Sequence, residues 1–173
     1  IGRVQELVHK YGKIAVGWGE VAKARLMPQA LVQPWHPGID PAPALAQGAQ
    51  LILSPANRIY LDMKYDQDTV LGLNWAGYVN TCAAYDWNPA TLLPGVPEQA
   101  IRGIEGPLWT ETILSLADIG YMIFPRLAGL AETAWSPEHR RSWGAYRTRL
   151  GAHAPRWRAL GIPFYPDPAV PWQ

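Results

Sequence analysis

The run Lys13-Ile14-Ala15-Val16-Gly17-Trp18 decides the fold that this sequence predicts. It is a short apolar stretch with the length of a buried strand. It follows a segment from Val4 to Tyr11 in which apolar residues recur at helical spacing, and Gly12 stops that pattern. A helix that leads within a few residues into a buried strand is the repeating step of a parallel α/β protein.

The same step recurs along the chain. Residues 30–35, 50–54 and 101–106 predict three further strands, and residues 41–48 predict a short helix of small residues with proline near its start. The four strands indicate either one half of an eight-stranded (β/α)8 barrel or a small open sheet, because both architectures use parallel strands with helical crossovers.

Irregular and helical segments fill the rest of the chain. Residues 65–97 lack a periodic pattern and predict a long structured loop, a kind of segment that is usually functional. One helix is predicted through residues 121–135, a helix start at Ser136-Pro137-Glu138, and a last helix over residues 143–160. The buried side of that last helix is expected to carry Tyr146, Leu150 and Trp157.

Charge and cysteine content exclude several classes of protein. The 15 Lys and Arg residues nearly balance the 14 Asp and Glu residues, so the chain has no field that would gather nucleic acid or anionic membrane. Cys82 stands alone and the four histidines have no paired ligand spacing, so neither a disulfide framework nor a zinc site is expected. The first residues resemble no signal peptide and include no initiator Met, and we expect the chain to begin inside a longer polypeptide.

Aromatic composition points to a ligand with flat faces and polar edges. The chain has 9 Trp and 8 Tyr but only 2 Phe. Such residues suit a surface that stacks on sugar rings and also forms hydrogen bonds with them. The alternative for any single Trp is that it only packs in the core.

The positions of the unusual residues favour the barrel over the open sheet. Trp18, Trp35, residues 57–62 and residues 109–111 lie at or just beyond the carboxyl ends of predicted strands. A (β/α)8 barrel places its active site at those ends, whereas an open sheet gathers ligand groups at one switch point.

Five motifs occur in one order along the chain. They are Gly17-Trp18-Gly19-Glu20, Gln33-Pro34-Trp35, Tyr60-Leu61-Asp62, Gly106-Pro107-Leu108-Trp109-Thr110-Glu111 and Phe124-Pro125-Arg126-Leu127-Ala128. In order and spacing, residues 1–163 resemble the C-terminal half of the catalytic barrel of β-N-acetylhexosaminidases. The resemblance implies that residues 1–173 form strands five to eight of a (β/α)8 TIM barrel with their helices, and that residues 137–173 form a terminal helix and a proline-rich tail.

The resemblance also implies an activity. Those enzymes remove terminal N-acetylglucosamine or N-acetylgalactosamine residues, and the 2-acetamido oxygen of the substrate itself attacks the anomeric carbon. They use no metal and no organic cofactor. The family favours a secreted or periplasmic location.

Site residues follow from the resemblance, one position at a time. Tyr60 donates a hydrogen bond to the attacking amide oxygen, Asp62 and Glu111 accept from hydroxyls at C4 and C6, and Trp75 stacks on the next sugar. The aromatic box around the acetyl methyl group is formed by Trp18, Trp35 and Trp109. Each residue also has a purely structural alternative, such as barrel core for Trp18 and Trp35 and stapling of the loop for Trp75. Asp62 and Glu111 could instead be solvated or form a salt bridge to a neighbour such as Arg58.

Two departures from the family pattern limit what this chain does by itself. Gly19 stands where the family usually has an acidic residue, which leaves Glu20 alone. No Asp-Glu dipeptide exists in the chain, although the family uses such a pair to orient the acetamido group and protonate the leaving oxygen. We therefore expect the N-terminal half of the same enzyme, or a second copy, to be a partner, because a half barrel has two unpaired strand edges.

Two other functional classes stay open. A non-catalytic carbohydrate-binding module would place its aromatic residues in a line on an exposed face. A structural fragment from a barrel with another sugar specificity would lack the set Tyr60, Asp62 and Glu111.

Overall fold

The computed structural model describes all of residues 1–173 and divides into two compact units. The first unit comprises Ile1–Pro55 and Pro89–Glu105, and the second comprises Ala56–Asn88 and Gly106–Gln173. Each unit has its own secondary structure and its own buried residues. No helix combines the length and the apolar character needed to cross a membrane.

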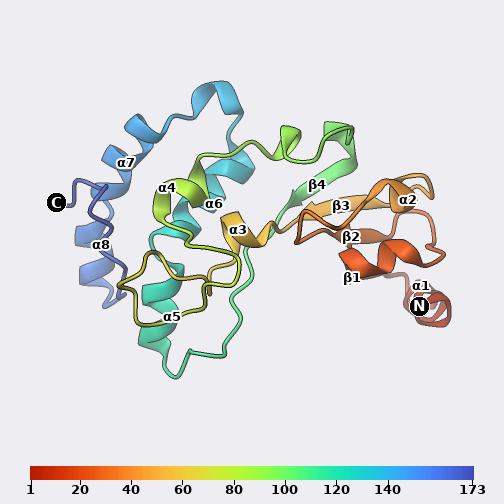
Figure 1. Ribbon diagram of the computed structural model, residues 1–173, viewed down its shortest axis with the longest axis horizontal. Helices are drawn as coiled ribbons and strands as arrows, with labels where there is room; N and C mark the ends of the chain where they lie inside the picture. Colours follow the sequence, from red (N-terminus) through yellow and green to blue (C-terminus); the bar gives the residue numbers. More distant parts are fainter. The chain divides into compact units, whose positions relative to one another are not determined.

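A four-stranded parallel sheet forms the first unit (Figure 1). Its strands pair in chain order and are β1 Val16–Trp18, β2 Leu31–Gln33, β3 Gln50–Leu53 and β4 Ile101–Ile104. Val32 pairs with both Gly17 and Leu51, and the side chains of Val32, Leu51 and Leu53 are completely buried. The four strands and their parallel α/β arrangement confirm the sequence prediction.

A polar contact links three strands at their carboxyl ends. The side-chain amide of Gln33 donates to Ser54 Oγ and to Glu105 Oε1, each at 2.8 Å. Because Gln33 ends β2 and Trp35 lies two residues later, this contact fixes the point from which the Trp35 segment leaves the sheet.

The helices of the first unit are short. They are α1 Gly2–Lys10, α2 Ala42–Leu45 and the 3-10 helices η1 Gly19–Lys23, η2 Pro89–Thr91 and η3 Glu98–Ala100. The sequence predicts α1 correctly, but its apolar residues Val4 and Leu7 are exposed. Gln5 is the buried residue of α1, and its side chain bonds to Met27 N and Arg25 O. Strand β1 ends the sheet on one side, and its Val16 is also exposed.

The second unit is mainly helical (Figure 1). Its elements are α3 Ala56–Ile59, α4 Thr81–Tyr85, α5 Leu116–Ile123, α6 Arg126–Trp135, the 3-10 helix η4 Glu138–Arg140, α7 Trp143–Gly151 and α8 Ala154–Ala159. The segment of residues 65–97 is therefore not only loop, because it contains α4 and η2.

Two helices that the sequence predicts as continuous are each divided. Residues 121–135 fall into α5 and α6, which are separated at Phe124-Pro125, and residues 143–160 fall into α7 and α8, with Pro155 near the start of α8. Proline has no N–H to donate and clashes with the preceding turn, so each helix ends before it. The predicted helix start at residues 136–138 is also wrong: it leads only into η4, and Ser142 instead caps α7 by accepting from Ala145 N.

An aromatic cluster forms the core of the C-terminal region. The rings of Tyr85 and Tyr146 stack with centroids 4.1 Å apart and planes 6° apart. Leu150, Trp157 and Val170 complete the buried set. The predicted buried side of the last helical region is thereby confirmed, although two helices supply it. The proline-rich tail is part of this core, because it contributes Val170.

Two glycines of α7 provide a matched pair for testing how the tail packs. A Cβ atom at Gly151 would overlap the carbonyl oxygen of Pro171, whereas a Cβ atom at Gly144 would meet nothing within 4 Å. We expect Gly151→Ala to lower the free energy of unfolding by about 1–3 kcal/mol, because the tail must shift. Gly144→Ala should be neutral or stabilising by up to about 1 kcal/mol. Denaturant unfolding followed by tryptophan fluorescence measures both variants, and equal changes would show that the tail does not pack on α7 in this way.

Candidate functional site

The residues of the predicted site are distributed between the two units. Trp18 ends β1 and Trp35 follows β2, both in the first unit. The other five predicted residues lie in the second unit, which carries Tyr60, Asp62, Trp75, Trp109 and Glu111.

In the first unit, an acidic side chain holds the Trp35 ring. The indole Nε1 of Trp35 donates to Glu20 Oε1 at 3.0 Å, and its ring lies 5.4 Å from that of His36. Trp18 and Trp35 are only partly buried, so neither is a fully enclosed core residue. Glu20 therefore fixes the orientation of one tryptophan of the expected aromatic box.

Packing accounts for the glycine at position 19. A Cβ atom there would lie 2.5 Å from Ile39 Cγ2 and 3.0 Å from Ile39 Cγ1. Gly19 is buried, and Ile39 occupies the space that any side chain at this position would need. At this departure from the family pattern, the chain packs an apolar side chain against the glycine.

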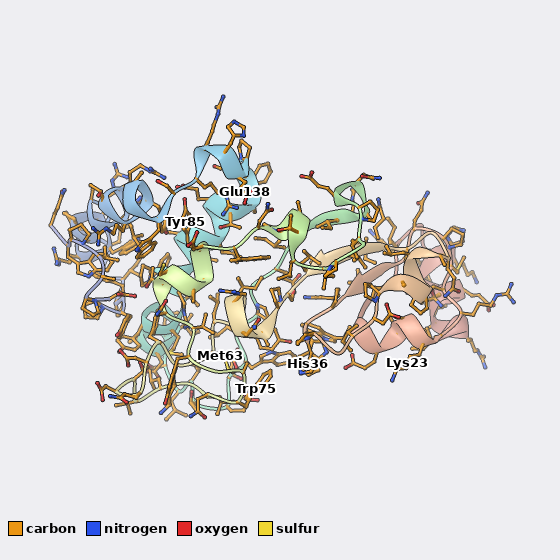
Figure 2. All side chains as sticks on the ribbon, turned by 45° about the horizontal axis from the view of Figure 1, so that its top comes forward. Lys23, His36, Met63, Trp75, Tyr85 and Glu138 are labelled. Carbon is orange, nitrogen blue, oxygen red and sulfur yellow. The ribbon has the colours of Figure 1, made fainter.

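In the second unit, three aromatic residues lie together. The Tyr60 ring meets Trp75 edge-on with centroids 5.8 Å apart, and it lies 6.4 Å from the Trp109 ring at an angle of 50°. Tyr60 is buried, whereas Trp75 is 53% exposed and Trp109 is 42% exposed. Trp75 projects from the segment that precedes α4 (Figure 2). The arrangement is an enclosed phenol between two indole rings that are open to a ligand.

Asp62 is a buried carboxylate without hydrogen-bond donors. It is only 2% exposed, and neither of its carboxylate oxygens has a hydrogen-bond partner. Burial raises the pKa of Asp62, and the negative charge of Glu111 raises it further. The backbone N–H groups of Asp62 and Trp109 and the cation of Arg126 act in the opposite direction, although those N–H groups do not reach hydrogen-bond geometry.

The bare carboxylate suits a ligand that brings its own donors. A buried acceptor without a donor costs about 1–3 kcal/mol, and more when it is charged. Hydroxyl groups of a bound sugar would supply the missing hydrogen bonds. Neither Asp62 nor Glu111 forms an ion pair with Arg58. Glu111 is solvent-exposed, as the structural alternative of a solvated acid expects.

Backbone contacts bring the Asp62 segment to the Trp109 segment. Leu61 N donates to Pro107 O at 2.8 Å, and Gly72 N donates to Thr112 Oγ1 at 2.8 Å. Gly72 has a φ of +92°, and a Cβ atom there would lie 2.5 Å from the carbonyl oxygen of Asp62. Only glycine fits this close approach, and it lets the chain return beside Asp62.

Sequence reasoning missed the roles of Glu20 and Gly72. Glu20 lies 15 residues from the indole that it binds, and no local pattern indicates such a pair. Gly72 gives a weak signal only, because a glycine within a loop is common.

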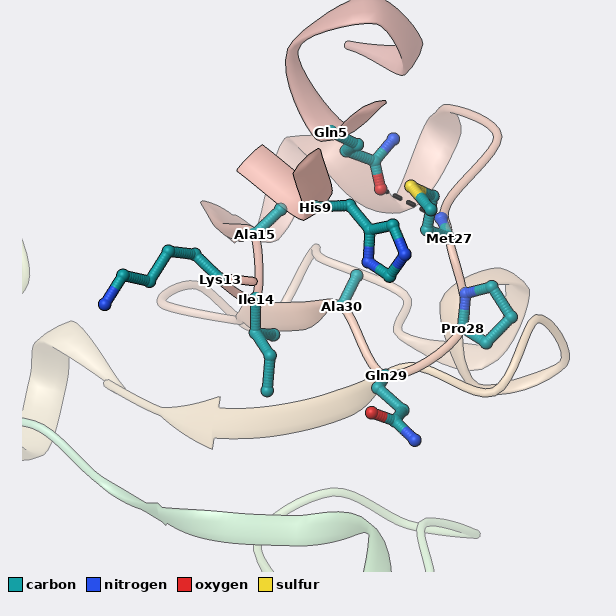
Figure 3. Close-up of a pocket in the computed structure, with 9 residues that line it drawn as sticks. All are labelled: Gln5, His9, Lys13, Ile14, Ala15, Met27, Pro28, Gln29 and Ala30. Atoms are coloured by element: carbon teal, nitrogen blue, oxygen red, sulfur yellow. Dashed lines mark hydrogen bonds between the residues drawn. The ribbon is translucent and has the colours of Figure 1, made fainter. Parts of the chain in front are cut away.

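A separate pocket lies at the amino ends of β1 and β2 in the first unit (Figure 3). Its lining residues are Gln5, His9, Lys13, Ile14, Ala15, Met27, Pro28, Gln29 and Ala30. Gln5 Oε1 accepts from Met27 N there at 2.9 Å, and none of the lining residues is acidic. The pocket offers no pair of carboxylates for acid–base chemistry, and it lies at the edge of the sheet opposite to Trp18 and Trp35.

Comparison with known proteins gives one consistent family. The curated relatives include a β-N-acetylhexosaminidase of Cellulomonas fimi, 43% identical over 99% of this chain and 35% of that protein. They also include a β-hexosaminidase of Porphyromonas gingivalis, 27% identical over 99% of this chain and 22% of that protein. This chain thus spans about a third or less of the length of these relatives.

Solved structures agree with the sequence relatives. The Streptomyces plicatus N-acetyl-β-hexosaminidase in complex with Thio-NAglucal superposes with a TM-score of 0.95 and 51% identity, over 99% of this chain and 36% of that chain. The GH20 β-N-acetylhexosaminidase of Streptomyces coelicolor A3(2) superposes with a TM-score of 0.92 and 50% identity, over the same two shares. The family profile described as "Glycosyl hydrolase family 20, catalytic domain" matches residues 1–138. The chain therefore belongs to glycosyl hydrolase family 20, a family of glycosidases, and carries part of its catalytic domain.

Proposed function

We propose that this chain supplies the sugar-binding part of an exo-β-N-acetylhexosaminidase. The complete enzyme would remove terminal N-acetylglucosamine or N-acetylgalactosamine residues by retaining catalysis in which the substrate's acetamido group is the nucleophile. One observation carries the proposal: the buried Tyr60 lies between two exposed indole rings, and the bare carboxylate of Asp62 follows two residues later. The names of the relatives support the same substrate class.

The fold that goes with this function is the C-terminal half of a (β/α)8 barrel. In this proposal β1 to β4 are strands five to eight, residues 1–173 belong to the barrel domain, and residues 137–173 are its terminal helical region and tail. The four parallel strands in chain order support it. So does the position of Trp18 and Trp35 at the carboxyl ends of β1 and β2.

The partner is the N-terminal half of the same enzyme. The outer edge of β1 is unpaired, and apolar side chains around it, including Val4 and Val16, are exposed. An unpaired apolar edge needs a cover. A preceding strand would pair with β1, and it would bring the Asp-Glu pair that this chain lacks.

Each site residue then has a chemical task. The Tyr60 hydroxyl donates to the acetamido oxygen and aligns it with the anomeric carbon, and alignment of this kind contributes about 7–11 kcal/mol to lowering a barrier. By resemblance to the family, Trp18, Trp35 and Trp109 are assigned to the aromatic box around the methyl group of the acetamide. Asp62 and Glu111 accept from the C4 and C6 hydroxyls, and the exposed Trp75 stacks on the next sugar.

The alternative of a non-catalytic carbohydrate-binding fragment has less support. Such modules present a line of exposed aromatic rings. Here the central ring, Tyr60, is 4% exposed, and a buried carboxylate lies two residues away. An enclosed phenol beside a charged acceptor is typical of a pocket that binds a single terminal sugar, rather than of a flat binding platform.

The first prediction concerns the chain by itself. Residues 1–173 in isolation should not hydrolyse an aryl N-acetylglucosaminide, because the general acid and the carboxylate that orients the acetamido group are missing. Release of the aryl alcohol measures the activity, with the complete enzyme as positive control. Turnover at the complete enzyme's rate by rigorously pure fragment would refute the proposal that the acids come from elsewhere.

The second prediction concerns Tyr60 in the complete enzyme. Tyr60→Phe should lower kcat far more than it weakens ground-state binding, because the hydroxyl aligns the attacking oxygen mainly as the transition state forms. Tyr78→Phe, an exposed tyrosine three residues beyond Trp75, is the control and should leave kcat unchanged. Steady-state kinetics measures both variants. A kcat for Tyr60→Phe within about twofold of the parent would make the assignment wrong.

The third prediction concerns Glu111. Glu111→Gln keeps the shape and removes the charge, so the loss of a charge-assisted hydrogen bond should cost about 1.5–3 kcal/mol in kcat/KM. The gluco and galacto substrates should lose unequally, because their C4 hydroxyls are equatorial and axial. The ratio of the two kcat/KM values, with the exposed Glu98→Gln as control, measures the effect. Unchanged values for both substrates would place Glu111 outside the pocket.

A further inference from the structure

We infer that Arg126 is a positioning residue for Asp62: its guanidinium holds the peptide groups on both sides of Asp62, so that the carboxylate is kept directed at the sugar. This inference rests on the proposed role of Asp62 in sugar binding. It gives a task to the motif at residues 124–128, to which neither the sequence nor the proposed chemistry assigns one.

Hydrogen bonds of the guanidinium bracket Asp62 in the sequence. Arg126 begins α6 and its side chain is fully buried. Nη2 donates to Leu61 O at 2.6 Å, and Nη1 donates to Met63 O at 2.7 Å. These two carbonyls belong to the residues directly before and after Asp62. Because one planar cation binds both, the two peptide groups cannot rotate independently of each other.

The remaining donors of the guanidinium tie this bracket to two other segments. Nη1 also donates to Val79 O at 2.9 Å, and Nη2 also donates to Met122 O at 2.6 Å. All four N–H bonds of the two Nη atoms are thereby directed at backbone carbonyls. The carbonyl oxygen of Asp62 itself accepts from Leu73 N at 2.8 Å, so three consecutive carbonyls of this segment are held.

An aromatic stack fixes the guanidinium in turn. Its central carbon lies 3.8 Å from the centroid of the Tyr65 ring, and Tyr65 stacks on Tyr165 with centroids 4.0 Å apart. The Tyr65 hydroxyl is directed at Met122 O and Phe124 O, each at 2.9 Å. The ring and the four carbonyls together hold the plane and the two Nη atoms of the guanidinium, whereas its Nε–H has no hydrogen-bond partner.

Charge adds to geometry at this site. Arg126 forms no ion pair. Burial lowers the pKa of Arg126, and Tyr65, Asp62 and Tyr121 oppose this effect. The cation in turn lowers the pKa of Asp62 and so opposes the effects of burial and of Glu111. Lysine would retain a positive charge but is a point charge, and it cannot span carbonyls in a planar fork.

The test compares how well variants of the complete enzyme recognise one sugar hydroxyl. The substrates are an aryl N-acetylglucosaminide and its 4-deoxy and 6-deoxy analogues. For each analogue, the ratio of the kcat/KM of the parent substrate to that of the analogue is measured in the unmodified enzyme and in Asp62→Asn. The analogue whose ratio falls most in Asp62→Asn is the reporter analogue. Arg126→Lys should lower the selectivity of the parent substrate over that analogue by about threefold or more, because a misdirected carboxylate no longer meets its hydroxyl.

This selectivity separates positioning from general stability. A ratio of two kcat/KM values measured on one preparation does not depend on the fraction of folded enzyme, so a role limited to stability would leave the ratio unchanged. Arg149→Lys is the matched control, since Arg149 is an exposed arginine of α7 that binds Glu132. Its ratio should equal the parent's. Thermal unfolding of each variant shows which of them are folded.

Each outcome decides the matter. A lowered ratio in folded Arg126→Lys supports the inference. If Arg126→Lys keeps the ratio of the unmodified enzyme while Asp62→Asn lowers it, the inference is wrong and the proposed role of Asp62 stands. Parent ratios for both analogues in Asp62→Asn overturn the proposed role of Asp62, and the inference with it. If Arg126→Lys does not fold, Tyr65→Leu decides instead, because it removes the platform but keeps the arginine: a lowered ratio supports the inference and a parent ratio overturns it.

Discussion

One buried guanidinium organises the second unit. Arg126 satisfies carbonyl groups of residues 61, 63, 79 and 122, which lie in both chain segments of that unit. Buried carbonyls outside regular structure need partners, and the segment between α3 and α4 has almost no regular structure of its own. The arginine replaces the ladder of hydrogen bonds that a strand or a long helix would have provided. The arginine thereby holds an irregular segment in place through its backbone.

The same segment leaves one group unsatisfied. Every consecutive carbonyl from Leu61 to Met63 has a donor, whereas the Asp62 carboxylate has none. A segment that satisfies these carbonyls and leaves a buried carboxylate without a donor sacrifices stability at that carboxylate. Proteins tolerate such a local conflict mainly at functional sites. The contrast between a held backbone and a bare side chain is what distinguishes Asp62 from an acid that merely packs.

Much of the first unit could be predicted from its sequence, because its information is local. The apolar runs at residues 13–18, 30–35, 50–54 and 101–106 correspond to the four strands. The apolar face of α1 was also visible in the sequence, but the chain does not bury it. A periodic pattern of apolar residues predicts that one face of a helix is buried, but it does not indicate which part of the protein covers that face.

The second unit was harder to predict, for two physical reasons. The breaks before α6 and α8 depend on Pro125 and Pro155. Both prolines are plain in the sequence, but the prediction of continuous helices followed the spacing of apolar residues and disregarded them. The contacts of Arg126 reach carbonyls 47 to 65 residues earlier in the chain. Backbone carbonyls carry no residue identity, so no sequence pattern records which of them an arginine binds. Motif resemblance supplied the proposed assignments of the site residues, and it assigned no task to the arginine that binds the peptide groups beside Asp62.

In the first unit, a carboxylate holds an aromatic side chain, because Glu20 binds the Trp35 indole. Its carboxylate accepts from the Trp35 indole at 3.0 Å, while Ile39 fills the space next to Gly19. An indole has only one polar atom, so a single hydrogen bond to a charged acceptor restricts the rotation of the whole ring. If Trp35 forms a wall of the acetyl pocket, the shape of that pocket depends on this bond. The second unit uses a cation to direct a carboxylate, and the first uses a carboxylate to direct an aromatic ring. In both, a charged side chain constrains a residue that the proposed function assigns to sugar binding.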